Sequence, residues 1–179
     1  MSKAVAEVTL APDHAEAIRD AAIHSLGTTR WLTSKAIAGL TPEQWIFQTA
    51  PEVNHILWNV GHIATSESSF LPMTGGTSRA VPAGYKDLFG TGSEPKPSLD
   101  AYPDPDEVVD VFNNARQELI GHFKGLSGAQ LTAPTEGDMM RQLCPTVAQI
   151  LNFCVLHEAT HAGQILVARR ALGLPRFIG

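Results

Sequence analysis

The stretch VAQILNFCVLHEATHAGQILVARRA, residues 147–171, is the longest and most apolar helical segment that the sequence predicts, and it decides the fold class. Thr146 and Gln149 at its start have the form of a capping box, in which each side chain bonds the backbone N–H of the other residue. Gly173 and Pro175 are typical of the residues that end a helix. The segment therefore predicts one long helix with two histidines, His157 and His161, in its middle.

Three more amphipathic helices are predicted upstream of this segment. Asp13 and Glu16 have the form of a capping box before an alanine-rich stretch. Asp104 and Pro105 precede two acidic residues, as in the first turn of a helix. Together with apolar spacings of three, four and seven residues, these patterns predict helices over residues 14–38, 54–71, 105–124 and 146–171, and a short helical turn over residues 42–45.

These helices predict an all-α four-helix bundle that forms a single domain, residues 1–179. No segment alternates apolar and polar residues as a sheet requires, so the helices must bury their apolar faces against one another. Residues 74–104 hold four prolines and five glycines and sustain no helical period. This segment is long enough to return along the whole bundle, which favours an up-down-down-up topology with a long crossover between the second and third helices. A short similarity between residues 39–45 and 125–131 supports two helical hairpins.

Composition and charge disfavour several classes of protein. The 179 residues are 44% hydrophobic and carry a formal net charge of −5 without a lysine or arginine run, which disfavours binding to nucleic acid or to an anionic membrane. The N-terminus lacks the apolar core of a signal peptide, and no stretch approaches the roughly 18 apolar residues of a membrane span. Cys144 and Cys154 are expected about 15 Å apart along the last helix, too far for a disulfide. We expect a cytoplasmic protein.

The candidate chemistry lies in His157-Glu158-Ala-Thr-His161. Histidines four residues apart lie on one face of a helix, about one turn apart, so both imidazoles can reach one metal ion. The five residues also match His-Glu-x-x-His, the metalloprotease motif in which the glutamate is the general base. No histidine, aspartate or glutamate follows His161, however, so the downstream third ligand of those proteases is missing. We therefore expect the third ligand from upstream.

His62 is the best candidate for that third ligand. It lies in the middle of the predicted 54–71 helix on an apolar face, beside Gly61, whose missing side chain eases the close approach of another helix. His55 lies seven residues earlier, about 10 Å along the helix axis, and cannot share an ion with His62. A histidine on an apolar helical face is also common as a core residue satisfied by one hydrogen bond. The residues alone leave both alternatives open.

Two motifs, residues 58–62 (Trp-x-x-Gly-His) and residues 157–164 (His-Glu-x-x-His followed by Gly-Gln), resemble the paired motifs of the DinB/YfiT-like superfamily. The resemblance covers essentially the whole chain. It implies a bundle, often in homodimers, with a nickel- or zinc-like ion held by His62, His157 and His161. In several branches it also implies transfer chemistry with low-molecular-weight thiols. Ala162 stands where many relatives have arginine, so no role of that arginine carries over to this chain.

The expected function follows from the number of ligands. Three imidazoles leave at least one coordination position open, which is the arrangement of catalytic rather than structural metal sites. We expect a metal-dependent enzyme, a thiol S-transferase or hydrolase, that acts on a small-molecule substrate. Glu158 is a candidate general base or a partner of a metal ligand, and a solvated or structural acid is the alternative. The alternative function is a bundle that binds metal or another ligand without turnover.

Overall fold

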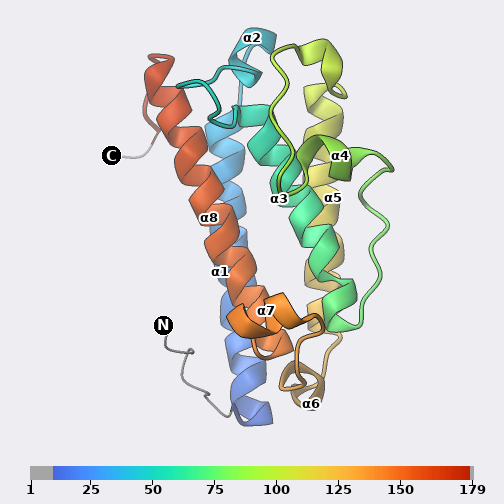
Figure 1. The fold of residues 1–179 in the computed structure, drawn as a ribbon. Coiled ribbons are helices and arrows are strands. Elements are labelled where there is room, and N and C mark those ends of the chain that lie inside the picture. The colour runs from blue at the N-terminus through green and yellow to red at the C-terminus, as the bar shows by residue number, and fades with distance from the viewer. Residues whose placement is uncertain (1–9, 178–179) are drawn as a thin grey trace, which may run out of the picture.

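Four long helices form the body of the molecule in the computed structural model, which describes residues 10–177 (Figure 1). Over these residues the only β feature is an isolated bridge between Pro134 and Thr146. The prediction of an all-α four-helix bundle is confirmed, and each long helix begins and ends within two residues of its expected bounds. The four are α1 (Pro12–Ile37), α3 (Ile56–Phe70), α5 (Pro105–Lys124) and α8 (Val147–Ala171).

Contacts at the helix ends show that α3 and α5 run parallel. The Nε2 atom of His55, at the start of α3, lies 3.2 Å from the hydroxyl of Tyr102, just before α5. The Nε2 atom of His122, near the end of α5, lies 3.0 Å from the hydroxyl of Thr74, just beyond the end of α3. The start of α3 thus lies beside the start of α5, and the end of α3 lies beside the end of α5. The connection between the two helices therefore returns along the full length of the bundle.

The other pair, α1 and α8, is also parallel and runs opposite to α3 and α5 (Figure 1). Arg169, near the end of α8, donates to the backbone oxygen of Ala36, near the end of α1, at 2.8 Å. Phe70, at the end of α3, packs on Phe153, near the start of α8. The helices therefore run up, down, down and up in chain order. None of the helices in the described part of the chain is both long and apolar enough to cross a bilayer.

The connection from α3 to α5, residues 71–104, is ordered by contacts with α5. It contains η1 (Pro72–Thr74), α4 (Tyr85–Phe89) and η2 (Leu99–Ala101). The Glu118 carboxylate on α5 accepts hydrogen bonds from the Ser78 hydroxyl and from the backbone N–H groups of Arg79 and Ala80, at 3.0–3.2 Å. Tyr85 and Phe89 of α4 are buried. The connection thus contributes to the core.

Short helices mark the remaining turns: α2 (Pro42–Trp45), α6 (Gly128–Leu131) and α7 (Asp138–Leu143). The two segments that resemble each other in sequence, residues 39–45 and 125–131, both fold into such turns, α2 and α6, with a capping box at each start. One expected box is wrong: α1 begins at Pro12 after Ala11, without a side-chain cap. Glu16 instead accepts a hydrogen bond from the backbone N–H of Gly128 at 2.8 Å, because α6 packs against the start of α1.

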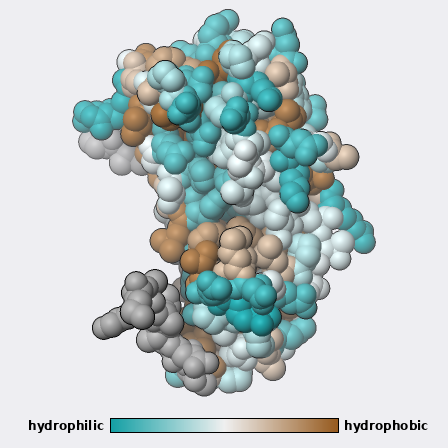
Figure 2. Space-filling view, viewed as in Figure 1, coloured by the Kyte–Doolittle hydropathy of each residue, from teal (hydrophilic) through white to brown (hydrophobic). Residues whose placement is uncertain are grey.

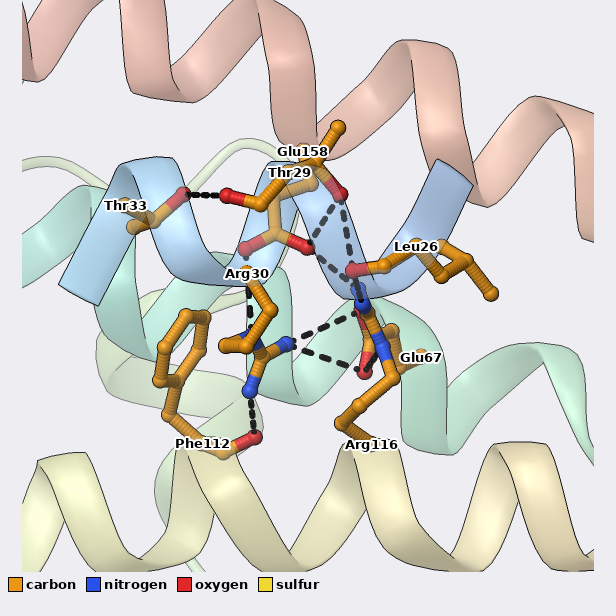
Figure 3. A network of polar contacts seen from close by, with 8 residues as sticks. All are labelled: Leu26, Thr29, Arg30, Thr33, Glu67, Phe112, Arg116 and Glu158. Carbon is orange, nitrogen blue, oxygen red and sulfur yellow. Dashed lines mark hydrogen bonds and ion pairs between the residues drawn. The ribbon is translucent and has the colours of Figure 1, made fainter. Parts of the chain in front are cut away.

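A network of four charged residues, three of them buried and Arg30 13% exposed, ties the four long helices together (Figure 3). Each long helix supplies one residue: Arg30 from α1, Glu67 from α3, Arg116 from α5 and Glu158 from α8. Both guanidinium groups bond both carboxylates. The two carboxylates are at most 1% exposed, and Arg116 is 3% exposed. Two positive and two negative charges balance, so the network is neutral where charge is costly to bury.

This network separates the apolar core into two clusters. Along α3, Ala64 belongs to one cluster and Phe70 to the other, with Glu67 between them. The same order holds on α5, where Arg116 lies between Ala115 and Leu119. Backbone oxygens complete the hydrogen bonding of the guanidinium groups, and Arg30 also lies over an aromatic ring of α5. The charges therefore occupy a full layer of the bundle.

His55 caps α3, and its contacts make the stability of the fold depend on pH. Its Nδ1 atom accepts from the backbone N–H of Trp58 at 3.0 Å, so its Nε2–H donates to Tyr102. Burial lowers the pKa of His55 from 6.5 to about 4. The unfolded chain takes up a proton below about pH 6.5, whereas the folded chain does so only near pH 4. The free energy of unfolding should therefore fall as the pH drops through this window.

Replacing His55 with asparagine tests this pH dependence. Asparagine is a good helix cap and does not titrate, so the helix start is kept while the linked proton is removed. We expect His55→Asn to lose less stability than the unaltered protein between pH 7 and pH 5, measured by urea unfolding of metal-free protein. If the free energy of unfolding falls equally with pH in the two proteins, His55 is not the source of the pH dependence.

Candidate metal centre

Three histidine side chains converge between α3 and α8. His62, His157 and His161 each offer one ring nitrogen, and these nitrogens lie within 4.8 Å of one another. The Nε2 atoms of His62 and His157 are 3.2 Å apart. Two nitrogens bound to one tetrahedral zinc ion are about 3.3 Å apart, given Zn–N bonds of about 2.05 Å. The residues that the sequence singled out as ligands are thus brought to one point.

Hydrogen bonds to the far side of two rings fix which nitrogen faces the cluster. The Nδ1–H of His62 donates to the backbone oxygen of Phe89 at 2.7 Å. The Nδ1–H of His161 donates to the side-chain oxygen of Asn59, also at 2.7 Å. Both partners accept, so in the neutral rings the proton lies on Nδ1 and Nε2 carries the lone pair that a metal ion needs. Metal-binding histidines typically have such partners, which orient the ring and raise its basicity.

Gly61 allows α4 to reach the centre. A Cβ atom at position 61 would lie 2.4 Å from the Phe89 ring, closer than real Cβ contacts come. The absence of that atom lets Phe89 pack directly on α3, which places its carbonyl against His62. On the other side, the Trp58 ring stacks on the His62 ring with centroids 4.5 Å apart. The imidazole of His62 is therefore clamped before any ion binds.

The electrostatic environment keeps the three rings neutral. Burial, with repulsion from His62, lowers the pKa of His157 from 6.5 to about 4. Burial and repulsion from the other two rings lower the pKa of His161 to about 3. Burial also lowers the pKa of His62, although its bond to Phe89 opposes the shift. Only the neutral imidazole coordinates metal, so the donor set fits a divalent cation at neutral pH.

The structure places Glu158 and His55 away from this cluster. Both carboxylate oxygens of Glu158 are bonded within the buried charge network, to Arg30, Arg116 and the Thr29 hydroxyl. Among the described residues no hydrogen bond joins Glu158 to a histidine of the cluster. His55 is engaged by Trp58 and Tyr102, as described above.

Two contributors to the centre were missed in the sequence, Asn59 and Phe89. Asn59 precedes His62 by three residues, so both side chains lie on the same side of α3, and this spacing was the available signal. Phe89 acts through its backbone oxygen, which no side-chain pattern reveals. It lies in the connection, where the prolines and glycines hid the five-residue helix α4.

Removing the amide of Asn59 should weaken metal binding. Asn59→Ala leaves the His161 ring without its acceptor, and loss of such a partner typically lowers metal affinity by about 10–100-fold. Asn59→Asp is the matched control because it keeps an oxygen for the Nδ1–H group while losing the amide donors that bond the start of α3. We expect titration with zinc and a competing chelator to show weak binding for the first variant only. Equal weakening in both would mean that Asn59 acts through helix stability.

A cavity of about 470 Å³ opens beside the cluster, with His62 and His157 in its wall. Cavities of about 300–1,000 Å³ are typical of small-molecule sites. Two of the three histidines, His62 and His157, therefore face a cavity that can hold a small molecule.

Comparisons with known proteins show the family and the fold of the chain. The sequence matches the DinB superfamily over residues 25–165. Among solved structures, the chain is similar to YfiT from Bacillus subtilis, described as a probable metal-dependent hydrolase with an unusual four-helix bundle topology. The TM-score is 0.65 at 15% sequence identity, over 88% of this chain and 89% of YfiT, a likeness that shows the shared fold. No curated protein matches the chain in sequence.

Proposed function

The chain belongs to the DinB superfamily, and on that premise we propose that it is a divalent-metal-dependent enzyme whose ion is held by His62, His157 and His161. The observation that carries the proposal is the convergence of three neutral imidazoles, two of them oriented by hydrogen bonds to Phe89 and Asn59. Nickel or zinc suits three nitrogen ligands. YfiT, which shares the fold, is described as a probable metal-dependent hydrolase.

The chain offers three imidazole ligands, which leaves at least one coordination position for water, a thiol or a substrate. A divalent ion held by these three rings would lower the pKa of a bound water to near neutrality and would deprotonate a bound thiol. The chain's own contribution is to hold the three rings neutral and oriented, and to leave a cavity beside them. We propose hydrolysis or thiol S-transfer on a small molecule as the reaction class, with a low-molecular-weight thiol as a candidate cosubstrate.

Glu158 receives a structural role in this proposal. Its carboxylate is fully buried and holds two guanidinium groups, so it is not free to accept a proton from water or a thiol.

A turnover screen with and without metal tests the proposed function. Protein loaded with zinc or nickel is assayed with ester and amide substrates and with thiol–electrophile pairs, before and after treatment with a chelator. We expect turnover that disappears on chelation, returns on reloading, and is absent from a loaded His157→Ala preparation. Tight metal binding without turnover on any substrate would instead favour the alternative, a bundle that binds metal without catalysis.

We further propose that two copies associate through the outer face of α1 and α8. Between residues 147 and 168, α8 has one charged residue, and that residue, Glu158, is buried. Large apolar side chains are exposed on these two neighbouring helices: Trp31 is 53%, Leu156 66% and Val167 58% exposed. Three large apolar side chains exposed on two adjacent helices favour a partner that covers this face. We also propose that the protein is cytoplasmic. Cys144 and Cys154 are buried and carry free thiols, which is typical of proteins in a reducing compartment.

Light scattering of purified protein tests this association. We expect a mass of twice the 19.2 kDa of one chain. The double variant Leu156→Asp/Val167→Asp should give the mass of one chain, because it puts charges into the apolar face without touching the core. A single-chain mass for the unaltered protein at micromolar concentration would contradict the proposed homodimer.

A further inference from the structure

The cavity beside the three histidines has walls from distant parts of the chain. One wall comes from α3 and the start of α8, with Phe70 and Phe153. The connection supplies Lys86 and the residues that follow α4, and α7 supplies a third wall with Met139 and Met140. Figure 2 shows an apolar band across the face of the molecule at the level of α7. The connection between α3 and α5, together with α7, thus determines which molecules can approach the histidines.

The lining has a single permanent charge. Lys86 is the one lysine or arginine in the wall, and no aspartate or glutamate lines the cavity. Among the described residues, Lys86 forms no ion pair, and its side chain is exposed to solvent. A cation without a partner, at the rim of an apolar cavity, attracts an anionic group and repels a cationic one.

The rest of the wall favours an apolar body. Three of the chain's four methionines lie in it: Met73, Met139 and Met140. Methionine side chains are flexible and polarizable, so they adapt to chains of different shape. Two of the hydroxyls, on Thr65 and Ser69, already donate to backbone oxygens of α3 at 2.8 Å. Their hydrogens are not available to a polar ligand.

From this lining we propose that the cavity binds an amphiphilic anion, a molecule with a carboxylate beside Lys86 and a flexible apolar chain against the methionines and phenylalanines. That such a molecule is the substrate rests on the proposed function. Its binding does not, because the charge and the apolar wall belong to the protein itself. The cavity then selects the substrate, while the histidine cluster determines where it reacts.

Straight-chain carboxylates serve as probes of this binding. Metal-free protein carrying ¹³C-methyl methionine is titrated with butanoate, hexanoate and octanoate, and with octylammonium as the charge-reversed control. Single Met→Leu variants assign the signals. We expect the signals of Met73, Met139 and Met140 to shift, and the affinity to rise by about fourfold for each methylene that becomes buried. Octylammonium should bind more weakly than octanoate.

Variants of Lys86 test the charge. Lys86→Gln should weaken octanoate about two- to fivefold at low salt, the size of an exposed ion pair, and Lys86→Arg should retain the affinity. Lys35→Gln, on the exposed surface of α1, is the matched control and should have no effect. All three variants change exposed side chains, so folding is preserved.

Any of three outcomes would overturn the inference. Equal affinity for octanoate and octylammonium would remove the role of Lys86. Methionine signals that do not move, or an affinity that does not depend on chain length, would remove the apolar site. Measuring zinc binding on the same protein preparations separates the two proposals. Binding of zinc without binding of octanoate contradicts only the inference about the cavity. Binding of octanoate without binding of zinc contradicts only the metal centre.

Discussion

Replacing Arg116 with methionine is expected to destabilise the protein by about 3–5 kcal/mol, the usual cost of leaving a buried charge without its partner. Arg116 bonds the carboxylates of Glu67 and Glu158 and the backbone oxygen of Leu26. Its removal leaves two buried carboxylates facing one guanidinium group, that of Arg30. Typical domains have a free energy of unfolding of about 5–15 kcal/mol, so this single change removes a large part of it.

Urea unfolding of the variant and of a double variant measures this cost. Glu67→Gln/Arg116→Met removes one carboxylate together with its cation, so it should be more stable than Arg116→Met alone, although it carries one more substitution. Lys35→Met is the surface control, because Lys35 is exposed on α1. A loss for Arg116→Met no larger than that of the surface control would contradict the network.

The second large effect concerns the metal. His157→Ala should lower the affinity for zinc by at least about 100-fold, because two remaining imidazoles make a weak site and the vacated space admits water. His62→Ala should have the same effect, since both rings face the same point, with their Nε2 atoms 3.2 Å apart.

Elemental analysis after dialysis measures this loss, with His24→Ala as the control because His24 is exposed on α1. We expect about one ion per chain in the unaltered protein and in His24→Ala, and close to none in the other two. Loss of metal in His157→Ala with unchanged content in His62→Ala would break the proposed ligand set.

The long helices could be predicted because their signals are local. A period of 3.6 residues, a proline at the first position and a glycine after the last act within one segment, so α5 was placed at its observed bounds, Pro105–Lys124. The short helices α4, α6 and α7 have five, four and six residues. At that length a helical period is not visible, and their positions depend on packing against the bundle.

The candidate site was only partly predictable for a related reason. The histidine spacing on α8 and the glycine beside His62 are visible in sequence, and the fold brings both helices together. The partners of Glu158 could not be predicted, since they come from two other helices, α1 and α5, at positions where charged residues are ordinary in amphipathic segments. An acid within an apolar helix is the signal, but it does not tell a catalytic carboxylate from one that holds the bundle together.

The buried network and the histidine cluster support each other. Glu158 lies next to His157 on α8 and is held by residues from α1 and α5. This fixes the rotation of α8 about its axis, and with it the direction of the rings on its other side. Metal affinity should therefore depend on the network even though no network residue is a proposed ligand.

Anomalous diffraction from crystals of zinc-loaded protein, recorded on both sides of the zinc absorption edge, tests the metal centre most directly. One peak per chain is expected between α3 and α8, about 2.0–2.1 Å from a ring nitrogen of each of His62, His157 and His161. A peak elsewhere, or none between these three rings, would contradict the proposed centre.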